Sequence, residues 1–407
     1  MNIVILTSLL PFPLTSGGAQ AQYNMIDSLR HNHKFVIVFP ENGYNRMKAM
    51  QELQTKWPEV EFKPYCYYEQ VISPRFLWDK MVRSFNLIFR KRSKSFQVER
   101  ILKPYGFPVD NKFVSFVERI VRESSADYLQ IDFYPFLSLI PRFSNDIKKI
   151  FVHHEIRYIR NNRLLADFQL TKEEDTLFRE LKNEEIANLN HCDKIITLTN
   201  VDKLELQKSG VTSPIYVSPA AVSTLQKEYI PWNRTLIFLG SYSHFPNQEG
   251  VDWLMKKVLP LVKWEKHFPI TMRIVGSGWP KSYNQNINGL VVKCDGYVEH
   301  LPKVLSGSIM LVPILSGSGM RMKILEAAAL NVPFVTTSVG VEGLDFKDSV
   351  SCLIADDPKE YAESIYQLIC NQTLHRSIAE SASCVFEEKY SLSALAKCRD
   401  AVYHDLM

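Results

Sequence analysis

The chain has 407 residues, which is enough for two domains that each bury a hydrophobic core. Hydrophobic residues make up 46% and charged residues 23% of the sequence, and this composition excludes a chain too polar to fold. The formal net charge is small, +4, and no apolar stretch reaches the length of a membrane span.

The seven cysteines are scattered without CxxC or Cys/His ligand spacing. This odd, unpatterned set indicates a reducing compartment and no structural metal. The opening run, residues 1–13, is apolar but has no basic stretch and ends in prolines. We therefore expect a first strand and loop there, not a signal peptide.

Strands alternate with helices along the first half, which is the pattern of a parallel sheet. We predict strands at 3–7, 35–39, 128–132, 149–153 and 194–198, and helices at 19–29 and 164–190. Gly17 and Gly18 lie where the first strand meets the first helix. They either form a tight turn or line a cleft.

Residues 75–103 form a basic segment, with nine lysines or arginines against Asp79 and Glu99. Aromatic and aliphatic residues are interleaved with these cations. Such a segment is typical of a surface that contacts an anionic membrane, and equally of a solvated helical face. Binding to nucleic acid is disfavoured, because no nucleic-acid-binding motif is present.

Two histidines, His153 and His154, stand at the end of the strand predicted at 149–153. Ligands bind at the carboxyl ends of strands in open parallel sheets. The pair is therefore either ligand-binding or structural. We expect no metal here, because adjacent histidines point apart in an extended chain and no carboxylate stands at ligand spacing.

Prolines interrupt the pattern within residues 217–233, where we place the boundary between the two halves. A strand is predicted at 236–240. Residues 309–337 then read as a buried strand at 309–314, a glycine loop, a helix at 320–330 and a strand at 334–337. The tail after residue 357 is helical.

The glycine loop opens a helix and is a candidate anion site, because free N–H groups and the positive end of the helix dipole face the ligand. Arg321 and Lys323 lie in the first turn, an unfavourable place for cations unless an anion binds there. Glu326 shares a helix face with Lys323. A cation for phosphate and a carboxylate for ribose hydroxyls predict a nucleoside diphosphate site. The alternative is a loop before an ordinary helix with a Lys–Glu surface pair.

The run GSGMRMKILEAAA, residues 317–329, resembles the motif GxGxRxKxxEAxA of the retaining GT-B glycosyltransferases, the glycosyltransferase group 1 family. Further stretches resemble the family in the same order. They are residues 11–29, 236–260, 272–278, 292–305 and 338–344. The resemblance covers nearly all of the C-terminal half and is patchy between residues 40 and 190.

This resemblance implies an α/β protein of the GT-B fold, in which two Rossmann-like, doubly wound domains face a cleft. It implies an acceptor-binding domain at 1–222, a nucleotide-sugar-binding domain at 223–385, and a C-terminal helix at 386–407 that packs back on the first domain. The implied enzyme is a hexosyltransferase that moves a sugar, with retention, from a nucleotide-diphosphate donor to a glycan or lipid-linked saccharide in bacterial surface polysaccharide synthesis. We expect it in the cytoplasm, with residues 75–103 as a possible contact to the inner face of the membrane.

The resemblance also implies the site residues. They are His154, Arg321 and Lys323 for catalysis, Gly317, Ser318, Gly319, Met320, Glu326, Ser241 and Tyr297 for the donor, and Gly17 and Gly18 on the acceptor side. In such enzymes the departing diphosphate helps to deprotonate the incoming hydroxyl, so the protein must stabilise charge on the leaving group. Fixed cations do this, and we expect no metal and no other cofactor.

Two positions depart from the family pattern. Ser318 stands where the fuller motif has a first glutamate, eight positions before Glu326. The stretch SYSHFPNQ, residues 241–248, lacks the Arg and Lys of many members, so Arg321 and Lys323 are expected to hold the phosphates alone. Two alternatives stay open, a non-catalytic GT-B subunit that binds a partner or polysaccharide, and a sugar-nucleotide epimerase on the same fold.

Overall fold

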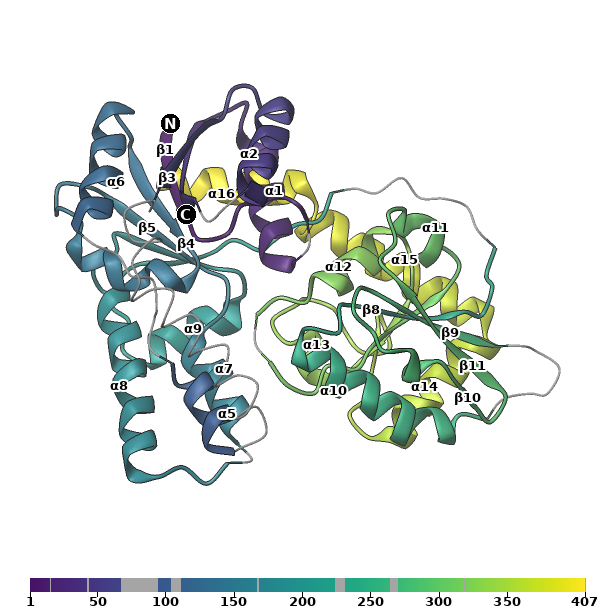
Figure 1. Cartoon of the computed structure of the whole chain (residues 1–407). Helices are drawn as coiled ribbons and strands as arrows, with labels where there is room; N and C mark the ends of the chain where they lie inside the picture. Colours follow the sequence, from purple (N-terminus) through teal and green to yellow (C-terminus); the bar gives the residue numbers. More distant parts are fainter. Residues whose placement is uncertain are drawn as a thin grey trace. The chain divides into compact units, whose positions relative to one another are not determined.

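Figure 1 shows the computed structural model of the chain. It describes residues 1–14, 16–41, 44–66, 94–103, 111–166, 168–223, 231–263, 270–317 and 319–406. The chain divides into two compact units, Met1–Ser218 with Arg399–Met407, and Pro219–Cys398. Most of the predicted basic segment lies outside the described residues, and only its last part is seen, as helix α5 (Lys94–Ile101).

A seven-stranded parallel sheet forms the centre of the described part of the first unit (Figure 1). Its order is β3-β2-β1-β4-β5-β6-β7. The strands are β1 (Asn2–Thr7), β2 (Lys34–Glu41), β3 (Glu61–Cys66), β4 (Tyr128–Asp132), β5 (Lys149–His153), β6 (Lys194–Thr197) and β7 (Ile215–Val217). Strands β2 and β3 lie on one side of β1, and β4 to β7 lie on the other side. The carboxyl ends of β1 and β4 therefore flank a topological switch point.

Helices connect these strands, as the doubly wound prediction requires. They are α1 (Gly17–Leu29), α2 (Tyr44–Lys56), α5, α6 (Asn111–Glu123), the 3-10 helix η1 (Tyr134–Arg142), α7 (Arg157–Leu165), α8 (Lys172–Leu189) and α9 (Asn200–Lys208). The single helix predicted at 164–190 is wrong. Thr171 and Glu174 form a reciprocal capping box, and this box starts a new helix at Lys172.

The second unit repeats the same plan over its described residues. Its seven-stranded sheet has the order β10-β11-β9-β8-β12-β13-β14, in which β10 and β11 are antiparallel and the other pairs are parallel. The strands are β8 (Leu236–Leu239), β9 (Thr271–Val275), β10 (Gln285–Ile287), β11 (Leu290–Gly296), β12 (Ile309–Val312), β13 (Phe334–Thr336) and β14 (Leu353–Ile354). The switch point of this sheet lies between β8 and β12.

The helices of the second unit are α10 (Phe245–Trp253), α11 (Leu301–Leu305), α12 (Met322–Ala329), α13 (Ser338–Val341), α14 (Pro358–Cys370), α15 (Gln372–Lys389) and the beginning of α16 (Leu392–Tyr403). Residues of α10, α14 and α15 pack with β8, β9 and β12 in one core. Short turns complete the unit, the π turn η2 (Leu254–Val258) and the 3-10 turns η3 (Leu259–Leu261) and η4 (Lys281–Tyr283). Within the described ranges, no helix combines the length and the apolar character that crossing a membrane requires.

The end of α16 belongs to the first unit. Tyr403 is fully buried, and its hydroxyl donates a hydrogen bond to Gln130 on β4 over 2.6 Å. Lys194 on β6 donates to the Val402 carbonyl over 2.7 Å and forms an ion pair with Asp405 at 2.6 Å. These contacts fasten the C-terminal turn to the first sheet. The returning segment was predicted at 386–407, and the part assigned to the first unit begins at Arg399.

Candidate active site

The predicted glycine loop follows β12, next to the loop that follows β8, at the switch point of the second sheet. Gly317 and Gly319 have φ angles of 104° and 84°, which side chains with a Cβ rarely adopt. Helix α12 begins three residues after Gly319, and Arg321 at its N-cap makes no side-chain cap. The first N–H groups of α12 are therefore oriented toward the loop. Ser318, the position of the missing glutamate, lies outside the described residues.

Lys323 is the best-defined cation of this loop. Its Nζ donates a hydrogen bond to the Oδ1 atom of Asn247 over 2.8 Å and lies 4.4 Å from the centre of the Phe238 ring. The pKa of Lys323 is lowered to about 7, mainly by burial; Glu326 opposes this shift, and Arg321 adds to it. The Asn247 oxygen that accepts from Lys323 carries no full charge. A bound anion would therefore raise the pKa of Lys323 and favour its charged form.

Arg321 has a different position from the one expected for a phosphate contact. Its guanidinium donates to the carbonyl oxygen of Gly319, and to that of Gly317 over 3.2 Å. In this structure the side chain therefore braces the glycine loop. A phosphate contact would require the guanidinium to leave these carbonyl groups or to share its remaining N–H groups.

The other residues predicted to bind the donor differ in their burial and in their contacts. Glu326 is half-buried one turn along α12 from Lys323. Ser241 follows β8, and its Oγ atom lies 3.1 Å from the Oγ atom of Ser243. Met320 is partly exposed in the loop, whereas Tyr297 is 74% exposed and lies on the loop after β11. Ser241 is linked to Lys323 through Asn247, which bonds to both residues. Binding of the donor by Tyr297 remains a prediction.

Asn247 links the two loops and was not among the predicted site residues. Its Nδ2 atom donates to the Ser241 carbonyl over 2.9 Å, while its Oδ1 atom accepts from Lys323. Nearby, the Ser316 hydroxyl donates to Glu249 over 2.6 Å, which joins the start of the glycine loop to α10. The sequence signal for Asn247 was its place in the PN dipeptide at the start of α10, in the stretch that resembles the family.

In the first unit, two of the predicted residues, Gly18 and His154, meet at one aromatic ring. Gly17 and Gly18 open α1, and a Cβ atom on Gly18 would lie 2.9 Å from Cε1 of Phe133. The Phe133 ring stacks on His154 with a centroid distance of 4.2 Å and an interplanar angle of 17°. Phe133 itself has a φ angle of 69°, an uncommon backbone conformation that often marks functional sites. The carboxyl ends of β4 and β5 and the start of α1 thus form one cluster.

His154 is neutral in this cluster. Burial, together with the charge of Arg399 and the neighbouring His153, lowers the pKa of His154 to about 3. Its Nε2 atom is buried and receives no hydrogen bond from the described residues. A buried nitrogen of this kind is suited to a neutral hydrogen bond with a ligand hydroxyl, and unsuited to carrying a positive charge.

His153 has a structural role. Its Nε2 atom lies 3.1 Å from Glu185, and both side chains are almost completely buried. The same carboxylate accepts hydrogen bonds from the backbone N–H groups of Arg157 and Tyr158, at the start of α7. His153 therefore helps to hold the carboxylate that caps α7, and His154 is the histidine left for a ligand.

A buried carboxyl group at the end of β4 was missed by sequence reasoning. Asp132 accepts hydrogen bonds from Gln22 over 2.5 Å and from Gln130 over 2.9 Å. Burial raises the pKa of Asp132 to about 6, against the lowering effect of these amides and of Arg399. Its contacts with Gln22 on α1 hold the start of that helix beside the strand that carries Phe133.

Comparison with known proteins supports one family for the second unit. Residues 233–371 match the family model described as glycosyl transferases group 1. The match spans most of the second unit, and it includes the glycine loop, Lys323 and Glu326.

Relatives and solved structures extend the likeness to the whole chain. An uncharacterized 44.6 kDa protein in the cps region of Klebsiella pneumoniae is 20% identical, and the alignment covers 96% of each chain. An uncharacterized glycosyltransferase of Haemophilus influenzae is 25% identical over 48% of this chain and 57% of its own. HepE of Anabaena, solved in complex with UDP, is 14% identical and covers 100% of both chains with a TM-score of 0.68. The predicted α/β GT-B fold with two Rossmann-like sheets is confirmed.

Proposed function

We propose that the protein is a retaining hexosyltransferase that transfers a sugar from a nucleoside-diphosphate donor to a glycan or lipid-linked saccharide. The observation that carries the proposal is the arrangement around Lys323. A half-buried amine with a lowered pKa stands beside a left-handed glycine loop at a helix start, one turn from Glu326. This combination provides N–H groups and a cation for a diphosphate, and a carboxylate for ribose hydroxyls.

The residues of the glycine loop and of α12 would stabilise the charge that develops during transfer. As the bond from sugar to diphosphate breaks, negative charge accumulates on the leaving oxygen. The diphosphate raises the pKa of Lys323, which takes up a proton from solvent. The resulting ammonium group and the N–H groups at the start of α12 stabilise the negative charge. Arg321 supports the loop and brings a second positive charge to the phosphates when its guanidinium turns toward them. These fixed charges supply the stabilisation without a metal ion, and we propose that the transfer needs none.

The acceptor is assigned to the first unit. His154 offers a buried, neutral imidazole nitrogen beside Phe133, and Gly18 keeps the backbone of the α1 loop against the same ring. An aromatic ring next to a hydrogen-bonding nitrogen suits a sugar, which has an apolar face and hydroxyl groups. We assign His154 to a hydroxyl of the transferred or accepting sugar and not to proton transfer, because its lowered pKa makes it a poor base.

The setting is proposed from the relatives. HepE has also been solved with UDP-glucose, which supports a nucleotide sugar as the donor class. The Klebsiella relative comes from a cps region, which is consistent with surface polysaccharide synthesis. We propose that the protein acts in the cytoplasm, with the basic segment as its contact to the inner face of the membrane.

A donor panel tests the proposal. Purified protein is incubated with UDP- and GDP-linked hexoses without acceptor, and the release of nucleoside diphosphate and free sugar is followed. Slow hydrolysis of one donor, with retention at the anomeric carbon, is expected. An epimerised nucleotide sugar would instead favour the epimerase alternative, and no binding of any donor would favour a non-catalytic binding subunit.

A further inference from the structure

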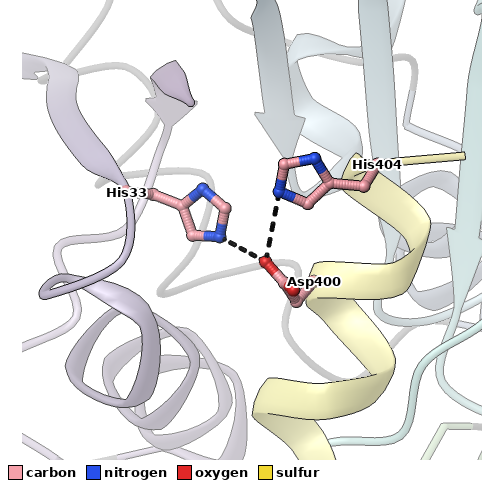
Figure 2. Close-up of side chains that lie close together, drawn as sticks. All are labelled: His33, Asp400 and His404. Carbon is pink, nitrogen blue, oxygen red and sulfur yellow. Dashed lines mark hydrogen bonds and ion pairs between the residues drawn. The ribbon is translucent and has the colours of Figure 1, made fainter. Parts of the chain in front are cut away.

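Two histidines and an aspartate, none of which has been assigned a role above, meet at the C-terminal turn of the first unit. Figure 2 shows His33, Asp400 and His404 around one carboxylate oxygen. The Nε2 atom of His33 lies 2.8 Å from Oδ1 of Asp400, and the Nε2 atom of His404 lies 3.5 Å from the same oxygen. The three possible ligand atoms all lie within 4.8 Å of one another.

Two of these distances, 2.8 Å and 3.5 Å, are close to the edges of a metal coordination shell, and the third is no longer than 4.8 Å. Zinc binds imidazole nitrogen and carboxylate oxygen at about 2.0–2.2 Å, so neighbouring ligands of a tetrahedral ion stand about 3.3 Å apart. Asp400 and His404 are four residues apart and project from the same face of the C-terminal turn, and His33 approaches from the residue before β2 (Figure 2). Small rotations of the exposed side chains would bring all three atoms to coordination distance.

The buried ligand is held in position before any metal arrives. The His33 side chain is 1% exposed. Its ring packs edge-on against Tyr403 at a centroid distance of 5.4 Å and lies 6.1 Å from the Phe35 ring. Its Nδ1 atom lies 3.3 Å from the Met1 nitrogen, and its Nε2 atom faces Asp400. An imidazole that binds a metal through Nε2 carries its proton on Nδ1, so metal binding requires the Met1 amine to be neutral and to accept that proton.

The outer side of the cluster is open to solvent. The side chains of Asp400 and His404 are 41% and 44% exposed. Three protein ligands and access for water are the composition of a four-coordinate zinc ion with one water ligand. Magnesium and calcium prefer oxygen ligands only, so two imidazoles disfavour them.

We propose that His33, Asp400 and His404 bind a zinc ion that fastens the end of α16 to the start of β2. The ion would join residues that are 367 positions apart in sequence. It would act with the contacts of Lys194 and Tyr403 described above, which fasten the same turn to the sheet. The ion would fasten the end of the chain and would not touch Lys323 or the glycine loop, which belong to the other unit.

Metal binding to the full-length protein tests this inference. Protein freed of metal with a chelator is titrated with Zn²⁺ alone, and the bound metal is counted after dialysis. Titration with Co²⁺ gives a second readout, since cobalt in a tetrahedral site of this kind absorbs visible light. One ion per chain is expected. Saturation with Zn²⁺ should also raise the thermal midpoint by several degrees.

The variants His404→Gln and Asp400→Asn remove exposed ligands and should leave the fold intact. Each is expected to weaken Zn²⁺ binding at least tenfold and to abolish the thermal shift. His31→Gln is the matched control, because this histidine is 71% exposed and pairs with Glu59 instead. It should bind like the parent protein. Binding of Zn²⁺ that is equal in the parent and in His404→Gln, or that falls equally in the control, would overturn the site.

Discussion

Nucleotide binding should weaken as the pH rises above 7, because Lys323 loses its charge there. Burial lowers the pKa of this amine to about 7 in the ligand-free protein. A bound diphosphate favours the ammonium form, so above this pH the protein must take up a proton in order to bind. The sign follows directly. Affinity is highest below the pKa of the free amine, where Lys323 is already charged, and it falls at higher pH.

The size of the effect has a slope and a limit. Above the pKa, the charged fraction of Lys323 falls about tenfold for each pH unit. The affinity stops falling once the nucleotide binds equally well without the charge on Lys323, so the total loss equals the free energy of that charged contact. A hydrogen bond to a charged group contributes about 1.5–3 kcal/mol, so the total loss of affinity should be about 10- to 150-fold. Phosphate groups lose their last proton near pH 6, so measurements between pH 7 and 9.5 avoid that titration.

Calorimetric titrations with UDP and GDP at constant ionic strength measure this dependence. Lys323→Arg should bind with little change over the same range, because its guanidinium stays charged. Lys323→Met should bind weakly at every pH, and its thermal midpoint should not fall, since a half-buried cation has been removed. A slope in the Lys323→Met protein equal to that of the parent would refute the assignment of Lys323 to the diphosphate.

Three further predictions concern the donor site. Glu326→Gln should weaken nucleotide binding by roughly 1.5–3 kcal/mol while the fold is kept, and unchanged affinity for UDP and GDP in calorimetry would remove its ribose role. Arg321→Ala should lower the turnover number more than nucleotide affinity, because its charge acts mainly on the leaving group; parental kinetics would contradict this. EDTA should not abolish transfer in a standard assay, whereas activity lost to EDTA and restored by Mg²⁺ or Mn²⁺ would overturn the metal-free proposal.

The central strands could be predicted closely because they are buried on both faces. The predictions at 128–132 and 149–153 coincide with β4 and β5, whose residues are all buried. Strand β3 was not predicted. It lies at the sheet edge, contains Pro64 and is only partly buried, so it has no continuous apolar run. Hydrophobic pattern therefore located the centre of the sheet better than its edge.

Local spacing could place the donor residues but not their partners. Lys323 and Glu326 are one helical turn apart, so sequence alone could put them on one face of α12. The bond from Lys323 to Asn247 spans 76 residues and depends on the packing of α10 beside the glycine loop. The stacking of Phe133 on His154 likewise depends on the order of the strands. Such contacts follow from topology, which a local pattern does not contain.

The basic segment leads to a prediction from sequence alone, because residues 67–93 lie outside the described part of the chain. If residues 75–103 contact the inner leaflet, the protein should bind anionic vesicles in a salt-sensitive way. Each cation near such a surface contributes on the order of 1 kcal/mol, and physiological salt screens the attraction beyond about 8 Å. Replacing Arg90, Lys91, Arg92 and Lys94 together by serine should therefore release the protein from vesicles of phosphatidylserine and phosphatidylcholine.

In the same variant, transfer to a soluble acceptor analogue should persist, because Lys323 and Glu326 are unchanged, and transfer to a lipid-linked acceptor should fall. A parent protein that ignores these vesicles at low salt would instead identify the segment as a solvated helical face, and a soluble glycan would become the expected acceptor.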